Sequence, residues 1–418
     1  MKTPWELLKE SKTKIKTTWR IAFVSALVLG LLIHLPVMLS DIPNHDGLSS
    51  MYFDQNMITS GRWFLTVACG FSSYFTIPWV IGLIGLIWLA LTAAVLTEVL
   101  ELTDPVTITV VSGLLVSFPA LASTFAYVFT MDGYMLALFL AVLAVLFTAK
   151  YPRGYLAGAV CLAFSMGIYQ AYLPFTILLC VYKILLYFME EKGWKEKAKY
   201  VCHYLGMGIA GGVLYYVILQ ILLKLQGKVL DTYQGINSME QMGSGMGILA
   251  TIKGMYVDFL AFTVHGNVLV NNIFSLAACI ILVATVVFLV IRSMIWRKWW
   301  KNPAFFVIMI LLGISMPLLT NVILLISPNL TYHLLMRYQW VLYLILMTAF
   351  ADRYTAEESR TDVVLQWAAL CAAVVLVFDY GISDNIGYSN LEKKYEKTYA
   401  YCVPVSYTHL RAHETRSN

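Results

Sequence analysis

Apolar stretches of about 20 residues recur from one end of this chain to the other, and each is long enough for a helix to cross about 30 Å of hydrocarbon. The chain has 418 residues, of which 60% are hydrophobic and 13% are charged. Soluble domains average about 25% charged residues. The sequence therefore predicts an all-α integral membrane protein.

We expect about eleven membrane-spanning helices in one polytopic domain over residues 21–380. The fifth and sixth spans have an alternative interpretation as one long kinked helix, in which Pro174 marks a break. The expected spans are 21–40, 77–97, 106–126, 134–149, 155–170, 171–189, 200–223, 268–291, 304–326, 338–351 and 363–380.

Lysine and arginine are concentrated in segments that alternate spans place on one side of the membrane. With the N-terminus inside, these segments hold 18 of the chain's 29 lysines and arginines. The positive-inside rule then predicts a basic cytoplasmic N-terminus over residues 1–20 and a location in the cytoplasmic membrane. The segments are 1–20, 98–105, 150–154, 190–199, 292–303 and 352–362.

The outside loops expected from this orientation are long enough to fold. In loop 41–76 we expect a short interfacial helix from Leu48 to Ile58, ended by Gly61. In loop 224–267 we expect an amphipathic helix from Ile248 to Phe262. Residues 381–405 are expected to begin an outside C-terminal segment that is charged and helix-prone. Residues 406–418 do not continue this pattern and are interpreted as a non-native tail.

The first outside loop opens on a dense polar cluster, Asn44-His45-Asp46-Gly47, and continues through Asp54 to Arg62. A carboxylate, an imidazole, amides and a guanidinium directly outside a bilayer indicate a reaction centre at the membrane surface. Asp46 is the first candidate, because a carboxylate beside an apolar wall becomes a better base. The alternative is that Asp46 caps a helix that starts near Ser49. Asp54 is a second candidate for the same role.

Asp132 is the next candidate acid, in the short connection expected between the third and fourth spans. An aspartate surrounded by apolar residues is costly unless it has a partner. The alternative is a turn, since Asp132-Gly133 is a turn dipeptide. The predicted topology puts Asp46 and Asp132 at the same membrane face, as a glycosyl-transfer centre requires.

The outward-facing cations are few. Arg62 and Arg337 carry guanidinium forks that suit phosphate oxygens, although each could instead reach the lipid headgroups. Tyr169 and Gln170, between the fifth and sixth spans, add a phenol and an amide at the outer level. The sequence shows no histidine or cysteine spacing typical of a metal site, so we expect no metal ligand set and leave divalent-metal dependence open.

The order of several motifs resembles that of the GtrII-type bacterial membrane glucosyltransferases. The first is Gly61-Arg62-Trp63-Phe64, at the end of the acidic first loop, and the last is Arg337, after a Pro-containing loop. Between them lie the run from Phe129 to Leu138 and the run from Gly167 to Tyr172. The resemblance covers residues 20 to about 400.

The resemblance implies a GT-C-like enzyme that takes a hexose from a polyprenyl-phosphate donor, and the hexose expected from the family is glucose. The acceptor would be a cell-envelope polysaccharide or a related glycan at the outer face. By the same resemblance Asp46 is the acid of the first outside loop and Asp132 that of the second, while no cofactor or nucleic acid is expected. The residues assigned to donor binding are Arg62, Arg337, His45, Asn44, Tyr169 and Gln170.

Two other functions share the multi-span topology. A flippase or transporter of a lipid-linked saccharide would place its polar groups at the bilayer midplane, often in paired inverted halves. The candidate acids here are expected at span ends instead, and no inverted repeat is visible. A polysaccharide polymerase stays open as an alternative.

Overall fold

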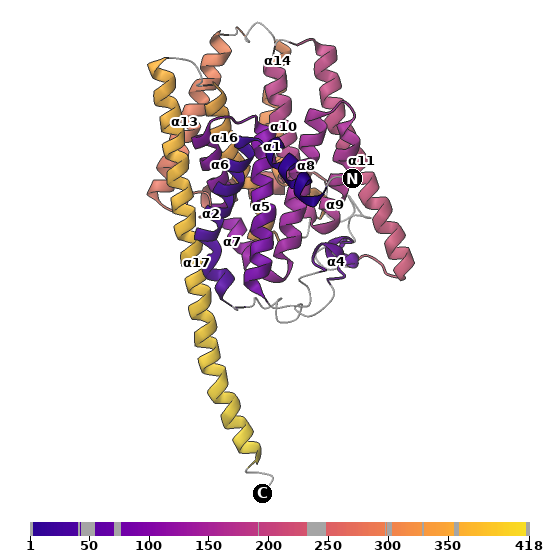
Figure 1. The fold of residues 1–418 in the computed structure, drawn as a ribbon, viewed down its shortest axis with the longest axis vertical. Helices are drawn as coiled ribbons and strands as arrows, with labels where there is room; N and C mark the ends of the chain where they lie inside the picture. The colour runs from indigo at the N-terminus through magenta and orange to yellow at the C-terminus, as the bar shows by residue number, and fades with distance from the viewer. Residues whose placement is uncertain are drawn as a thin grey trace.

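The computed structural model describes residues 3–40, 42, 55–70, 77–190, 192–231, 248–296, 298, 303–327, 330–354 and 359–414. Throughout this part of the chain the regular structure is helical, and the only β-type pairing is an isolated bridge between Met57 and Arg62. The expected all-α membrane architecture is confirmed. Figure 1 shows a bundle of roughly parallel helices, with α17 (Arg360–Glu414) continuing beyond the others at one end.

Nine helices in the described part of the chain are long and apolar enough to cross a membrane. A tenth span results if the bent pair α6 (Pro105–Ser117) and α7 (Pro119–Phe125), which meet at 50°, counts as one. The expected number of eleven is therefore not confirmed. The nine are Thr17–Leu39, Pro78–Leu100, Val128–Lys150, Gln170–Met189, Trp194–Gln226, Ile248–His265, Ile273–Trp296, Leu334–Tyr354 and Arg360–Val405.

The segment expected as spans five and six is two helices, which excludes the single kinked helix. The chain breaks at Tyr169, whose backbone is extended, between α9 (Gly154–Ile168) and α10 (Leu173–Met189). Pro174 does not make the break. It lies in the first turn of α10, where its missing N–H costs no helical hydrogen bond. With 15 residues, α9 is shorter than the other spans.

Three other boundaries differ from the sequence-based expectation. The expected span 304–326 is divided at Asn321 into α14 (Pro303–Thr320) and α15 (Val322–Ile326). A helix is present where the amphipathic helix from Ile248 to Phe262 was expected, but α12 (Ile248–His265) is three residues longer and apolar enough to span a membrane. The last helix does not end at residue 380, because α17 runs on without a break.

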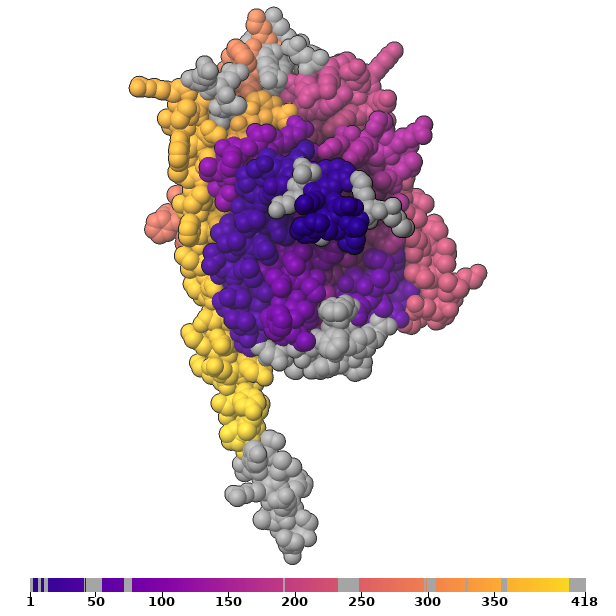
Figure 2. Space-filling model, viewed as in Figure 1, coloured from indigo at the N-terminus to yellow at the C-terminus, as the bar shows by residue number. Residues whose placement is uncertain are grey.

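The centre of the bundle is formed by α5 (Pro78–Leu100) and α8 (Met131–Lys150), which pack against each other. α2 (Thr17–Leu39) packs on α5, and α9 packs on α8. The α8–α9 approach is close at Gly158, where a Cβ would lie 2.7 Å from the carbonyl oxygen of Ala144. In the face shown in Figure 2, α17 borders the molecule on one side and α11 (Trp194–Gln226) on the other.

Two glutamates at the end of α5, Glu98 and Glu101, form ion pairs with residues at the ends of several other helices. These contacts bring segments 1–20, 98–105, 150–154 and 352–362 to one end of the bundle, and an ion pair between Arg292 and Asp362 adds 292–303. Five of the six segments predicted to share the cytoplasmic side are therefore connected at one end of the bundle. The ion pairs of the two glutamates are Lys16–Glu98 (2.7 Å), Lys150–Glu98 (2.7 Å), Lys183–Glu101 (2.5 Å) and Arg353–Glu101 (2.8 Å).

Candidate active site

The end of the first long loop forms a tight turn that fixes the position of Arg62. A short 3-10 turn, Ile58–Ser60, stops at Gly61, which has a φ of 77° in the left-handed region. The Gly61 carbonyl accepts a hydrogen bond from the Tyr215 hydroxyl at 3.0 Å. A Cβ at this glycine would lie 2.5 Å from that hydroxyl and 2.6 Å from Nε2 of Gln170. Gly61 is therefore required both by the backbone conformation and by the space.

Gln170 holds the same turn from the break between α9 and α10. Its Nε2 donates to the carbonyl of Ser60 at 3.1 Å and to the Tyr215 hydroxyl at 3.0 Å. After the turn, the backbone N–H of Phe64 donates to the carbonyl of Gly167 at 2.7 Å. The GRWF motif is thus attached to the GIYQ motif through hydrogen bonds, although the two lie far apart in the sequence.

Arg62 lies against two stacked tyrosines. Its Nη1 donates to the Tyr134 hydroxyl at 3.1 Å, and its guanidinium carbon is 5.0 Å from the centroid of the Tyr169 ring. The two rings stack with their centroids 4.2 Å apart. Burial is the main cause that raises the pKa of Tyr169, so its phenol is neutral and presents an uncharged ring face to the guanidinium. Cation–π contact of this kind orients an arginine without neutralising it.

Asp132 is not in a turn, because it lies in the first turn of α8 with only 3% of its surface exposed. Its Oδ1 accepts from the N–H of Gly133 at 2.9 Å, and an acid at a helix N-terminus is favoured by the helix dipole. Burial, followed by the charge of Asp132, raises the pKa of the nearby Cys69 thiol well above its ordinary value. The segment that follows Arg62 therefore packs on the start of α8, and Asp132 belongs to the Arg62 side of the molecule.

A row of aromatic rings runs from this cluster toward the second predicted arginine. Tyr169 contacts Tyr172 at 5.4 Å between ring centroids, and Tyr172 contacts Tyr338 at 6.3 Å. Tyr338 follows Arg337 in the irregular helix η6 (Leu334–Trp340). The two predicted arginines therefore lie in separate clusters that this row connects.

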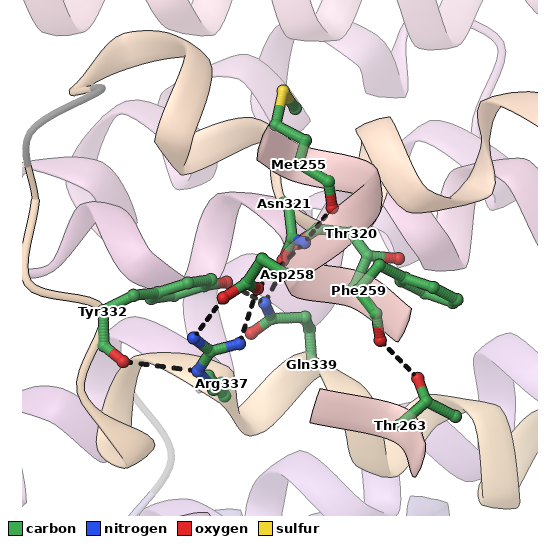
Figure 3. A network of polar contacts seen from close by, with 9 residues as sticks. All are labelled: Met255, Asp258, Phe259, Thr263, Thr320, Asn321, Tyr332, Arg337 and Gln339. Carbon is green, nitrogen blue, oxygen red and sulfur yellow. Dashed lines mark hydrogen bonds and ion pairs between the residues drawn. The ribbon is translucent and has the colours of Figure 1, made fainter. Parts of the chain in front are cut away.

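Arg337 is held by an acid that the sequence did not single out. Figure 3 shows the guanidinium facing the carboxylate of Asp258, on α12, through two parallel contacts of 2.7 Å. Its Nε donates to the carbonyl of Tyr332 at 3.3 Å. The guanidinium carbon lies 3.9 Å from the Tyr332 ring centroid and 4.7 Å from that of Phe262. Arg337 is 9% exposed, so the arginine of this bidentate ion pair is nearly buried.

Two buried amides complete the Arg337 cluster. Nδ2 of Asn321, at the break between α14 and α15, donates to Asp258 at 3.2 Å and to the carbonyl of Met255 at 2.9 Å. Nε2 of Gln339 donates to the carbonyl of Thr320 at 3.0 Å. These oxygen acceptors fix which end of each amide carries the nitrogen.

The structure thus brings together Arg62, Asp132, Tyr169 and Gln170, and places Arg337 in a second cluster. Asn44, His45, Asp46 and Asp54 lie outside the described residues. Sequence reasoning missed Asp258, although it is the only acidic residue between 248 and 265. It also missed the residues that position the two arginines, which are Tyr134, Tyr215, Asn321 and Gln339. Within the described part of the chain, no three His, Cys, Asp or Glu side chains gather as a metal site would require.

Comparison with known proteins identifies one family. The sequence model described as glucosyl transferase GtrII matches residues 35–351, which include both arginine clusters and Asp132. No curated protein and no solved structure matches the chain.

Proposed function

The chain belongs to the glucosyl transferase GtrII family, a family of glycosyltransferases, and we propose that it takes glucose from a polyprenyl-phosphate donor. The proposed acceptor is a cell-envelope polysaccharide or a related glycan at the outer face of the cytoplasmic membrane. The observation that carries this proposal is the Arg62 cluster, in which a guanidinium contacts two tyrosines at the end of the spans where the buried Asp132 also lies.

Arg62 is proposed to bind the donor phosphate. Its guanidinium is oriented by the Tyr134 hydroxyl and the Tyr169 ring, and a planar fork matches two phosphate oxygens. Gln170 sets the backbone of the turn before Arg62, so its contribution is to position rather than to touch the donor.

The chemistry proposed is a single displacement at the anomeric carbon. An acceptor hydroxyl attacks that carbon, and its oxygen forms the new glycosidic bond while the bond to the phosphate oxygen breaks. A base takes the hydroxyl proton, and the polyprenyl phosphate leaves with the electron pair. We assign the base to Asp46, with inversion at the anomeric carbon, and propose that Asp132 orients the sugar or the acceptor.

The outer-face orientation is supported by the distribution of charge over the fold. The segments rich in lysine and arginine gather at the end of the bundle where Glu98 and Glu101 form their ion pairs. The start of α8 is the opposite end of a 20-residue helix from Lys150, which contacts Glu98. Asp132, near the start of α8, therefore lies away from the basic end.

The test is transfer by the purified protein in lipid vesicles. Polyprenyl-phosphate glucose labelled in the sugar is supplied with a mixture of envelope glycans, and label in a glycan product supports the proposal. The variant Arg62→Ala should lower transfer. Arg153→Ala should not, because Arg153 precedes the first residue of α9, whereas the Tyr169 break near Arg62 follows the last. Label that only crosses the vesicle membrane, with no product formed, would make the protein a transporter.

A further inference from the structure

The guanidinium fork of Arg337 is already filled by a carboxylate. Both oxygens of Asp258 are 2.7 Å from its terminal nitrogens, in the parallel geometry that an arginine also forms with two phosphate oxygens. The side chain of Arg337 is 10% exposed, whereas that of Asp258 is 27% exposed. The carboxylate is thus the outer partner, and its departure would open Arg337 to an incoming anion.

Two hydrogen-bond acceptors lie beside this ion pair without a donor. Oδ1 of Asn321 and Oε1 of Gln339 are buried and accept no hydrogen bond from the described residues. Both side chains are 0% exposed, and their NH2 groups are fixed by the contacts shown in Figure 3. Buried acceptors of this kind normally find a donor. The hydroxyl groups of a sugar are donors of the right class.

The helix that carries Asp258 has few buried side chains. Only Thr251 and Met255 are buried along α12. Besides the ion pair, α12 is held through the carbonyl of Met255, bonded to Asn321, and through the Tyr256 hydroxyl, bonded to the carbonyl of Ile314 at 2.5 Å. The rings of Phe259 and Phe262 also contact Trp340, with centroids 4.7 and 4.8 Å apart. An aspartate side chain is short, so rotation about its Cα–Cβ bond can turn the carboxylate from the fork, but we expect that room for a ligand also requires α12 to shift.

We propose that the Asp258–Arg337 cluster is a sugar-phosphate site in its closed state. Asp258 occupies the position of a phosphate group, and the phosphate of the ligand displaces it and moves α12. Asn321 and Gln339 then accept hydroxyl groups of the sugar. The inference rests on the proposed function, because a polyprenyl-phosphate sugar has this combination of groups, and its one phosphate would occupy the Arg337 site and the Arg62 site in turn. No covalent bond changes in the exchange.

The first experiment measures the affinity of the purified protein in detergent for farnesyl phosphate, with farnesol as the uncharged comparison. Asp258→Asn removes the competing charge and keeps the shape, so farnesyl phosphate should bind about tenfold more tightly or better. Asp362→Asn, which changes the corresponding acid of the Arg292–Asp362 pair, should leave the affinity unchanged. A folded Asp258→Asn protein with unchanged or weaker binding overturns the proposal.

A second experiment does not depend on that variant. The side chain of Met255 is 2% exposed under the docked helix, so a cysteine in Met255→Cys should react slowly with maleimide. Farnesyl phosphate should accelerate modification at residue 255, measured by peptide mass spectrometry, and farnesol should not. Equal rates with both compounds would show that phosphate does not displace α12.

The two proposals can fail separately. If the wild-type protein transfers glucose but Asp258→Asn does not lower the KM for the lipid donor, the enzyme assignment stands and the closed site is wrong. If farnesyl phosphate displaces α12 but no glycan product forms, the sugar-phosphate site stands and the transfer reaction is wrong.

Discussion

Tyr134 and Tyr169 stack with their ring centroids 4.2 Å apart and their planes 9° from parallel, and both contact Arg62. The two rings come from α8 and from the break after α9, and Arg62 comes from the end of the first long loop. These contacts therefore join three segments of the chain. Because Tyr169 is in an extended conformation between two helices, its ring can face α8. The break between α9 and α10 therefore places the ring of Tyr169 against the guanidinium of Arg62.

Replacing Arg62 tests the donor contact. Arg62→Ala should raise the KM for the polyprenyl-phosphate donor by one to two orders of magnitude, since a charge-assisted bidentate contact contributes about 1.5–3 kcal/mol. Arg62→Lys should recover part of the loss, because it keeps the charge and loses the fork. Steady-state kinetics with donor varied at fixed acceptor measure both. An unchanged donor KM in Arg62→Ala would remove this residue from the donor site.

The turn before Arg62 gives a prediction about stability and activity together. Gly61→Ala puts a Cβ on a residue at φ 77°, which costs about 1–2 kcal/mol. The added atom also collides with Tyr215 and Gln170. We expect a lower unfolding temperature in detergent and weaker donor binding. Gly212→Ala, in α11 with open space around it, is the matched control and should be neutral or stabilising. Equal behaviour of the two variants would contradict the role of the turn.

The spans could be predicted from sequence because apolar length alone determines them, as α2 and α5 show. The break at Tyr169 could not, since an extended residue between two apolar helices leaves no pattern, and the nearby proline suggested the wrong position. Asp132 is at the predicted end of its helix but within the first helical turn rather than in the connection before it, because Asp-Gly is ambiguous between a turn and a first helical turn. The role of Asp258 could not be predicted from the sequence, since its contact with Arg337 joins residues far apart in the chain.

The ion pairs at the basic end predict a pH dependence of stability. Burial alone would raise the pKa of Glu101, but Lys183 and Arg353 outweigh it and hold the pKa below its ordinary value of 4.5. A lowered pKa in the folded state stabilises the protein above the unfolded-state value, and this contribution is lost as the pH falls. Glu101→Gln should therefore lower the unfolding temperature at pH 7, and the gap to wild type should close as the pH falls below 4.5. A gap that stays constant would show that the charge of Glu101 is not involved.

The orientation of the protein can be tested by labelling single cysteines in intact cells. We expect Asn56→Cys, on the Arg62 side, to react with a membrane-impermeant maleimide, and Lys195→Cys, at the start of α11, to react only after the cells are opened. Both positions are exposed, so accessibility to solvent is matched. The reverse pattern would place the Arg62 cluster in the cytoplasm and exclude an outer-face reaction.

The base of the reaction is the last point to test. Asp46→Asn keeps the shape of the side chain but removes its ability to take a proton, so kcat should fall by about 10²–10⁴. The donor KM should change little, because Arg62 and the tyrosines remain. Asp54→Asn, a second acid of the same loop, is the matched control and should retain most of the activity. The anomeric configuration of the product, read by NMR, should be opposite to that of the donor. A large loss of kcat in Asp54→Asn with near-normal Asp46→Asn would assign the base to Asp54, and retention of configuration would exclude a single displacement altogether.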